Sequence, residues 1–93
     1  MMQSNGRAET KSASRYITQL CKHWSHKFET SCDAANGEIR LPGAVLTLEA
    51  QEGALELTLA GEDLPELGRM GAVVAEHVDR FAFREAPLGF DWH

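Results

Sequence analysis

The sequence has few of the features that mark membrane and secreted proteins. Its 93 residues include two cysteines, Cys21 and Cys32, which form no CxxC motif. No apolar run is long enough to span a bilayer, and residues 1–11 contain no apolar stretch of the kind that a signal peptide needs. These absences predict a cytoplasmic protein that makes no contact with membranes and keeps both cysteines reduced.

Basic residues are scarce as well. The chain has 9 Lys and Arg against 14 Asp and Glu, which gives a net charge of -5. An acidic domain repels phosphate backbones, so the composition predicts no binding to nucleic acid. The one basic cluster is Lys22, His23, His26 and Lys27, and cations of this kind complement the dipole at the C-terminal end of a helix.

Established catalytic motifs are missing too. The chain has no Gly-rich phosphate loop, no GxSxG motif and no HExxH motif. Its acidic side chains at Glu49, Glu52 and Glu56 lie near a turn and on an outward strand face, where contact with solvent explains them. The sequence therefore favours a protein without catalytic activity of its own.

Apolar spacing predicts two amphipathic helices. After a flexible tail over residues 1–6 and a short polar strand over 7–13, apolar residues recur at helical spacing from Tyr16 to Phe28. The second helix begins at Asp63, which can cap it, and its apolar stripe continues to Phe81. Gly68 and Gly71 interrupt this helix and predict close packing against a neighbouring element.

Alternation of apolar and polar residues predicts the strands. It indicates strands over residues 28–32, 38–41, 45–49 and 55–59, with a hairpin turn at Asn36–Gly37. The aromatic tail Phe90-Asp91-Trp92 is expected to dock onto the domain.

These elements predict a single α+β domain over residues 7–93. The order is β-α-β-β-β-β-α, and one apolar face of an antiparallel sheet is available for both helices to cover. The expected fold therefore has two layers, with the two helices on one face. The same element order occurs in TATA-binding-protein-like folds, which is an analogy of shape alone.

Two blocks and the C-terminal ending resemble a known family. The blocks are Cys21-Lys22-His23-Trp24-Ser25-His26-Lys27-Phe28 and His77-Val78-Asp79-Arg80-Phe81-Ala82-Phe83-Arg84-Glu85, and the ending is Phe90-Asp91-Trp92. Together they resemble the bacterial family Domain of Unknown Function 2218, from about Ala8 onward. The resemblance implies a stand-alone bacterial domain without an established activity. It also implies a link to iron or siderophore handling, since relatives in the family occur beside siderophore-utilisation proteins.

The histidines are the candidate metal ligands. His23 and His26 are three residues apart on the predicted helix, so they are neighbours, and neutral imidazoles bind transition metals. His77, or alternatively Asp79, supplies a third ligand if the two helices pack side by side. The simpler alternatives are a solvated His26 and a half-buried His77 that is paired with a carboxylate. No cofactor is required, and a divalent transition metal is the candidate.

The sequence thus predicts a small binding or accessory domain. It forms a homodimer or binds a small protein partner through a surface made of His23, Trp24, His26, Lys27, His77, Asp79, Arg80, Phe83 and Trp92. The first alternative is a metal-binding protein with His23, His26 and His77 as ligands. The second alternative is an enzyme that uses His23 or His77 as a general base.

Overall fold

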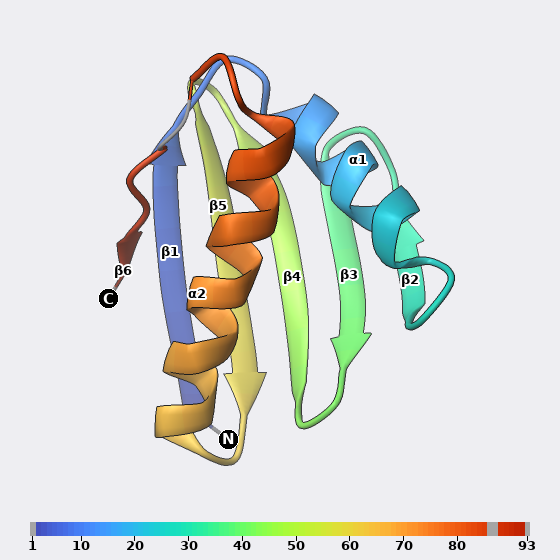
Figure 1. Ribbon diagram of the computed structural model, residues 1–93, viewed down its shortest axis with the longest axis vertical. Helices are drawn as coiled ribbons and strands as arrows, with labels where there is room; N and C mark the ends of the chain where they lie inside the picture. The colour runs from blue at the N-terminus through green and yellow to red at the C-terminus, as the bar shows by residue number, and fades with distance from the viewer. Residues whose placement is uncertain (1, 86–87, 93) are drawn as a thin grey trace.

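The computed structural model describes residues 2–85 and 88–92, which form two layers (Figure 1). A six-stranded antiparallel sheet has the strand order β2-β3-β4-β5-β1-β6, and both helices lie on the same face of it. The elements are β1 Met2–Glu9, α1 Ala13–Trp24, β2 Glu29–Cys32, β3 Asn36–Leu41, β4 Ala44–Gln51, β5 Ala54–Gly61, α2 Leu64–Phe81 and β6 Asp91–Trp92. The predicted α+β class and element order are confirmed, with β6 added at the end.

The core lies between the sheet and the two helices. Alternate residues of the central strands face it because side chains on a strand point to opposite faces in turn. Leu46 and Leu48 of β4 pair with Leu59 and Leu57 of β5, and all four are buried. Ile17, Leu20 and Trp24 of α1 and Leu67, Val74 and Val78 of α2 cover them from the other side.

The N-terminal strand begins earlier than the sequence indicates. Residues 2–6, expected to be part of a flexible tail, form the first part of β1 and pair with Leu57–Gly61 of β5; Met1 lies outside the described residues. The prediction was wrong because this strand carries few apolar side chains. Its core-facing positions near the centre are Gly6 and Ala8, whose small size gives almost no alternation signal.

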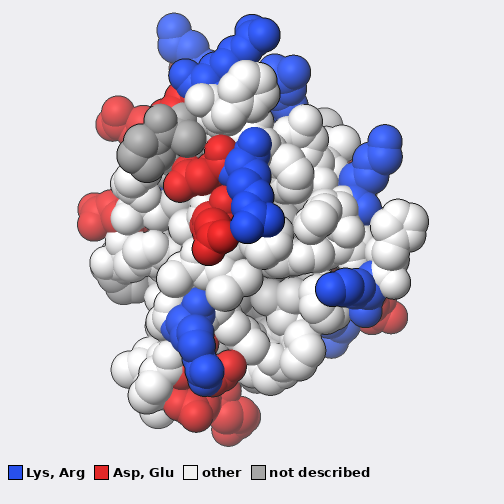
Figure 2. Space-filling model, viewed as in Figure 1, with Lys and Arg blue, Asp and Glu red and all other residues white. Residues whose placement is uncertain are grey.

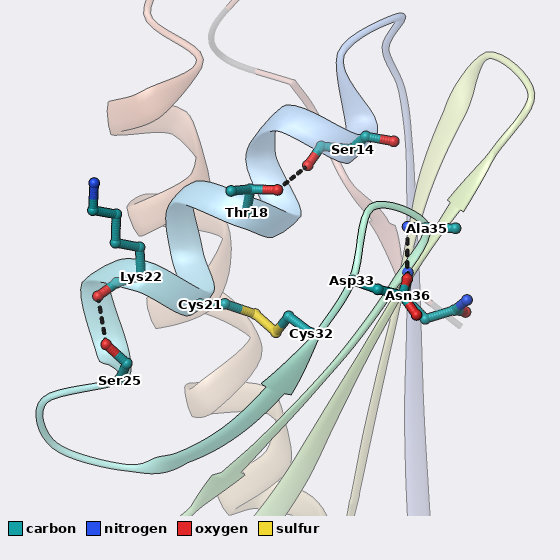
Figure 3. The surroundings of a disulfide bond; sticks show 9 residues. All are labelled: Ser14, Thr18, Cys21, Lys22, Ser25, Cys32, Asp33, Ala35 and Asn36. Carbon is teal, nitrogen blue, oxygen red and sulfur yellow. Dashed lines mark hydrogen bonds between the residues drawn. A yellow bond between two sulfur atoms is a disulfide. The ribbon is translucent and has the colours of Figure 1, made fainter.

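The turn between β2 and β3 also differs from the prediction (Figure 3). A hairpin turn was expected at Asn36–Gly37, but both residues lie in β3, and Gly37 does not have a positive φ. The turn lies earlier because Oδ1 of Asp33 accepts hydrogen bonds from the backbone N–H groups of Ala35 and Asn36, both at 2.8 Å. An aspartate that bonds to the backbone two and three residues on stabilises a turn by itself.

A disulfide joins α1 to the edge strand β2 (Figure 3). Cys21 and Cys32 are bonded across a Cα–Cα distance of 6.6 Å, so the expectation of two reduced cysteines is wrong for this structure. Sequence spacing could not reveal the pair, because it forms only when β2 folds back beside the last turn of α1. Gly37 makes room for it, since a Cβ there would lie 3.0 Å from Sγ of Cys32 and 3.2 Å from Sγ of Cys21.

The C-terminal segment docks on the domain, as predicted, and lies at the edge of the sheet beside β1 (Figure 1). Trp92 pairs with Gly6 in the β1–β6 ladder, and its ring is packed between Gly6 and Gly71. A Cβ on Gly6 would lie 2.9 Å from the ring and a Cβ on Gly71 would lie 3.1 Å from it. Gly71 therefore has the close neighbour expected for it, whereas a Cβ on Gly68 would meet no described atom within 4 Å.

Candidate functional site

The end of α1 and the middle of α2 bring two of the predicted histidines together. The ring centroids of His23 and His77 are 5.5 Å apart, although the residues are far apart in sequence. The ring of His77 also lies 5.0 Å from that of Trp24, and the ring of His23 lies 5.8 Å from that of Phe81. Both helices cover the same face of the sheet, and this arrangement makes the contact possible.

The orientation of His77 is set by its own helix. Its Nδ1 is 2.8 Å from the backbone carbonyl of Val73, one turn earlier. A carbonyl can only accept, so Nδ1 carries the proton and donates, which leaves Nε2 of a neutral ring as the free nitrogen. His77 is half-buried as expected, but its partner is this carbonyl and not a carboxylate.

His26 does not join the histidine pair. Helix α1 ends at Trp24, and the chain then turns, with the N–H groups of Lys27 and Phe28 both donating to the carbonyl of Trp24. The predicted helical spacing of His23 and His26 therefore does not exist, and His26 is exposed in the turn. Among residues 2–85 and 88–92, no group of three or more His, Cys, Asp or Glu side chains is placed to hold a metal ion.

Asp79 and Trp92, which were assigned to the same surface, lie elsewhere. The carboxylate of Asp79 accepts a hydrogen bond from the N–H of Leu88 at 3.1 Å, so it holds the C-terminal segment rather than a ligand. Trp92 packs on Gly6 and Gly71. Arg80 pairs with Glu76 at 2.9 Å in the favourable i,i+4 order, so its charge is already compensated.

A groove lies beside the histidine pair. It has a volume of about 270 Å³ and lies between the end of α1, the middle of α2 and the turn from β3 to β4. Its walls are mostly apolar, and Lys27 and His77 are the two ionisable residues that line it. The full lining is Trp24, Lys27, Phe28, Leu41, Pro42, Met70, Val73, Val74 and His77. Val73 is 44% exposed here, which leaves an apolar floor open to solvent.

Sequence reasoning identified Trp24, Lys27 and His77 but missed the rest of the groove. Met70, Val73 and Pro42 were not considered as site residues. No signal in the sequence marks them, because a groove depends on how far apart two helices lie, and that distance is set by packing rather than by periodicity.

A second polar cluster ties the turn after α2 to the start of α1. The hydroxyl groups of Thr10 and Tyr16 both donate to Oε1 of Glu85, with an O–O distance of 2.8 Å for Thr10. Hydrogen bonds from Tyr16 and then from Thr10 hold the pKa of Glu85 below its ordinary value. Burial raises the pKa of Tyr16, and the hydrogen bond to Glu85 raises it further.

Replacing Glu85 with Gln should weaken the acid dependence of folding stability. A carboxyl group whose folded pKa is lowered stabilises the fold above its ordinary value of 4.5, and this contribution is lost as pH falls through the folded pKa. The wild type should therefore lose stability more steeply below about pH 4.5 than Glu85→Gln, as urea unfolding at a series of pH values would measure. Asp33→Asn should change the acid dependence in the same direction, because backbone N–H groups lower the pKa of Asp33 too. Equal slopes for the wild type and Glu85→Gln would contradict the prediction.

The fold and the groove define the protein as a two-layer α+β domain with an apolar groove between its helices. The chain belongs to the family described as "Uncharacterized protein conserved in bacteria (DUF2218)", whose model matches residues 5–93, and the resemblance noted in the sequence is thereby confirmed. It is similar to PA4090 from Pseudomonas aeruginosa, whose structure was determined by NMR, with a TM-score of 0.84 and 34% identity. That likeness covers 100% of this chain and 96% of the other. The comparison with curated proteins gives no match. Neither helix in the described part of the chain is long and apolar enough to cross a membrane.

Proposed function

We propose that the protein is a non-catalytic binding domain whose groove takes a small apolar molecule with a carboxylate group. The observation that carries the proposal is the combination of apolar walls with the ammonium group of Lys27 and the imidazole of His77. Pockets for small molecules are mostly apolar, with a few polar groups that fix the orientation of the ligand. A volume of about 270 Å³ suits a single ring or a short aliphatic chain rather than a large cofactor.

Charge supports a ligand with an acidic group. The protein has a net charge of -5, yet the lining of the groove contributes one basic side chain and no carboxylate among its described residues. In the neutral ring that donates from Nδ1 to Val73, Nε2 of His77 is an acceptor, so it can bind a donor group elsewhere on the ligand but not the carboxylate itself. A carboxylate in contact with Lys27 would leave the apolar part of the ligand against Trp24, Phe28 and Val73.

A titration with defined probes tests the proposal. The ¹⁵N-labelled protein is titrated with hexanoate and phenylacetate, and separately with hexanamide and phenylacetamide, while amide and indole signals are followed by NMR. The carboxylates should shift the signals of Trp24, Val73 and His77 and bind more tightly than the amides, by about threefold for an exposed charge such as Lys27. Lys27→Gln should remove this difference without weakening the amides.

A pair of matched variants separates groove binding from a general effect of charge. Val73→Glu places a carboxylate in the groove, whereas Leu64→Glu places one on the same helix at another exposed apolar position, which is 53% exposed. Val73→Glu should abolish the binding and Leu64→Glu should leave it unchanged. Equal behaviour of the two variants, or no saturable binding of any probe at millimolar concentration, would refute the proposal.

The distance between the rings of His23 and His77 favours metal binding as a second candidate function. Two imidazoles 5.5 Å apart between centroids are close enough to share one ion, and the hydrogen bond of His77 to Val73 is typical of the support given to a ligating imidazole. Titration with Zn²⁺ or Ni²⁺ under native mass spectrometry, with His23→Ala and His26→Ala compared, tests it. Loss of binding in His23→Ala and not in His26→Ala is the expected result.

The link to iron or siderophore handling and the role of a histidine as general base stay predictions.

A cytoplasmic location is part of this proposal, and the state of the cysteines in the cell tests it. The cytosol keeps thiols reduced, whereas disulfides persist in oxidising compartments. Because Cys21 is buried, free thiols are labelled after cells are quenched in acid and the protein is denatured, and both Cys21 and Cys32 should be modified if the protein is cytoplasmic.

A further inference from the structure

A second hollow lies where α1 begins and α2 ends, away from the groove. It has a volume of about 150 Å³ and is lined chiefly by Arg15, Tyr16, Gln19, Phe81, Phe83 and Arg84. Figure 2 shows Lys and Arg side chains gathered at this end of the molecule, at the top of the view. We call this second hollow the arginine hollow.

The turn that carries half of this hollow is held in place by hydrogen bonds. Glu85 accepts from the hydroxyl groups of Thr10 and Tyr16, both of which belong to buried residues. Phe83 and Arg84 directly precede Glu85, so this anchor fixes them beside the first turns of α1. Oε1 of Glu85 accepts both hydrogen bonds, and these two donors stabilise the negative charge of the carboxylate.

The two arginines of the hollow differ from the others in the chain. Of the six arginines, four are paired with glutamates, in the pairs Arg7–Glu56, Arg40–Glu29, Arg40–Glu38, Arg69–Glu66 and Arg80–Glu76. Arg15 and Arg84 form no ion pair within the residues that the structure describes, and both line the same hollow. In a chain with a net charge of -5, two unpaired guanidinium groups at one place favour an external carboxylate, which arginine can bind with two parallel hydrogen bonds.

Two further groups indicate that the carboxylate comes from a peptide. Gln19 also lines the hollow, and its Oε1 is buried with no hydrogen-bond partner among the described residues, so this oxygen becomes an acceptor for a backbone N–H group of a bound segment once the side chain turns toward the hollow. Phe83 is 73% exposed, and the guanidinium carbon of Arg84 lies 5.7 Å from its ring centroid. Exposed aromatic and arginine side chains in contact are typical of the residues that dominate protein–protein binding.

We propose that the arginine hollow binds an acidic segment of a partner protein. The carboxylate of a Glu or Asp side chain is bound by Arg15 and Arg84, a backbone N–H group of the segment donates to Gln19, and an apolar side chain packs on Phe83. An inorganic anion would satisfy the arginines but would give Gln19 no donor. The site is separate from the groove and does not depend on the proposed ligand.

The test uses a defined peptide, acetyl-Gly-Glu-Phe-Glu-Gly-amide, and its counterpart with Gln in place of both Glu residues. Binding to the whole protein is followed by isothermal titration calorimetry and by NMR signals of the Arg15 and Arg84 side chains and the Gln19 amide. The acidic peptide should shift these signals and bind about tenfold more tightly than the Gln peptide. Arg15→Gln with Arg84→Gln should reduce the affinity for the acidic peptide by about the same factor.

Arg69→Gln with Arg80→Gln is the matched control, because it removes the same charge from two arginines that are already paired. An equal loss of affinity in this control, or equal binding of the two peptides, would overturn the proposal. Inorganic phosphate that binds as tightly as the acidic peptide would also overturn it. So would sedimentation showing self-association of the protein that the Arg15 and Arg84 changes abolish, because the occupant would then be a second copy of the chain. Val73→Glu should leave peptide binding unchanged, which separates this test from that of the groove.

Discussion

Trp92→Ala should lower the free energy of unfolding by about 2–3 kcal/mol, less than the loss for a fully buried tryptophan because the side chain is half-buried. The ring fills the space between Gly6 of β1 and Gly71 of α2 and packs against the core. Its removal leaves a cavity at the edge of the sheet and releases the strand pairing of Trp92 with Gly6. Urea unfolding, followed by circular dichroism, measures the change.

Two comparisons show whether the loss comes from this packing. Phe83→Ala removes another aromatic residue, but one that is 73% exposed, and should change stability by less than about 0.5 kcal/mol. Gly71→Ala should destabilise the protein because the new Cβ meets the Trp92 ring, whereas Gly68→Ala should stabilise it by about 0.5–1 kcal/mol through helix propensity. If Trp92→Ala and Phe83→Ala had equal effects, the docking of the C-terminal segment would contribute nothing measurable.

The elements that the sequence predicted well are those in which the local pattern and the tertiary packing agree. The alternating leucines of β4 and β5 face the core, as a period of two requires. Asp63 caps α2, and its carboxylate accepts a hydrogen bond from the N–H of Glu66 at 3.4 Å. Phe81, the last residue of the apolar stripe predicted for this helix, packs against the core.

The features that the sequence could not give depend on contacts between distant segments. Strand β1 is held by its pairing with β5, so its polar residues carry little information about it. Gly37 resembles the second residue of a turn, yet its lack of a side chain serves to accommodate the disulfide. The short-range rule gave the wrong turn because the hydrogen bonds of Asp33 place the turn earlier in the chain.

The candidate site shows the same division. The proximity of His23 and His77 could be predicted, because each histidine lies at a predictable place on a helix and both helices were expected on the same face of the sheet. His26 was assigned to the pair because the helix was extended to Phe28, but α1 ends at Trp24. The open floor at Val73 and the unpaired state of Arg15 and Arg84 appear only when the packing of the helices and the ion pairs is known.

Reduction of the Cys21–Cys32 bond should lower the free energy of unfolding by about 2–3 kcal/mol, since the bond closes a loop between cysteines 11 residues apart and limits the freedom of the unfolded chain. The loss should be greatest locally in β2, an edge strand of four residues that pairs with β3 alone and is covalently tied to α1 through this bond. Hydrogen exchange should therefore accelerate over residues 29–32 before it does in β4 and β5. Urea unfolding with and without dithiothreitol measures the global change on an unaltered sequence, and a variant with Cys21→Ser and Cys32→Ser should show no dependence on the reductant. Equal unfolding midpoints for the oxidised and reduced wild type would mean that α1 and β2 are held together by packing, and that the disulfide adds nothing to the stability of this edge of the sheet.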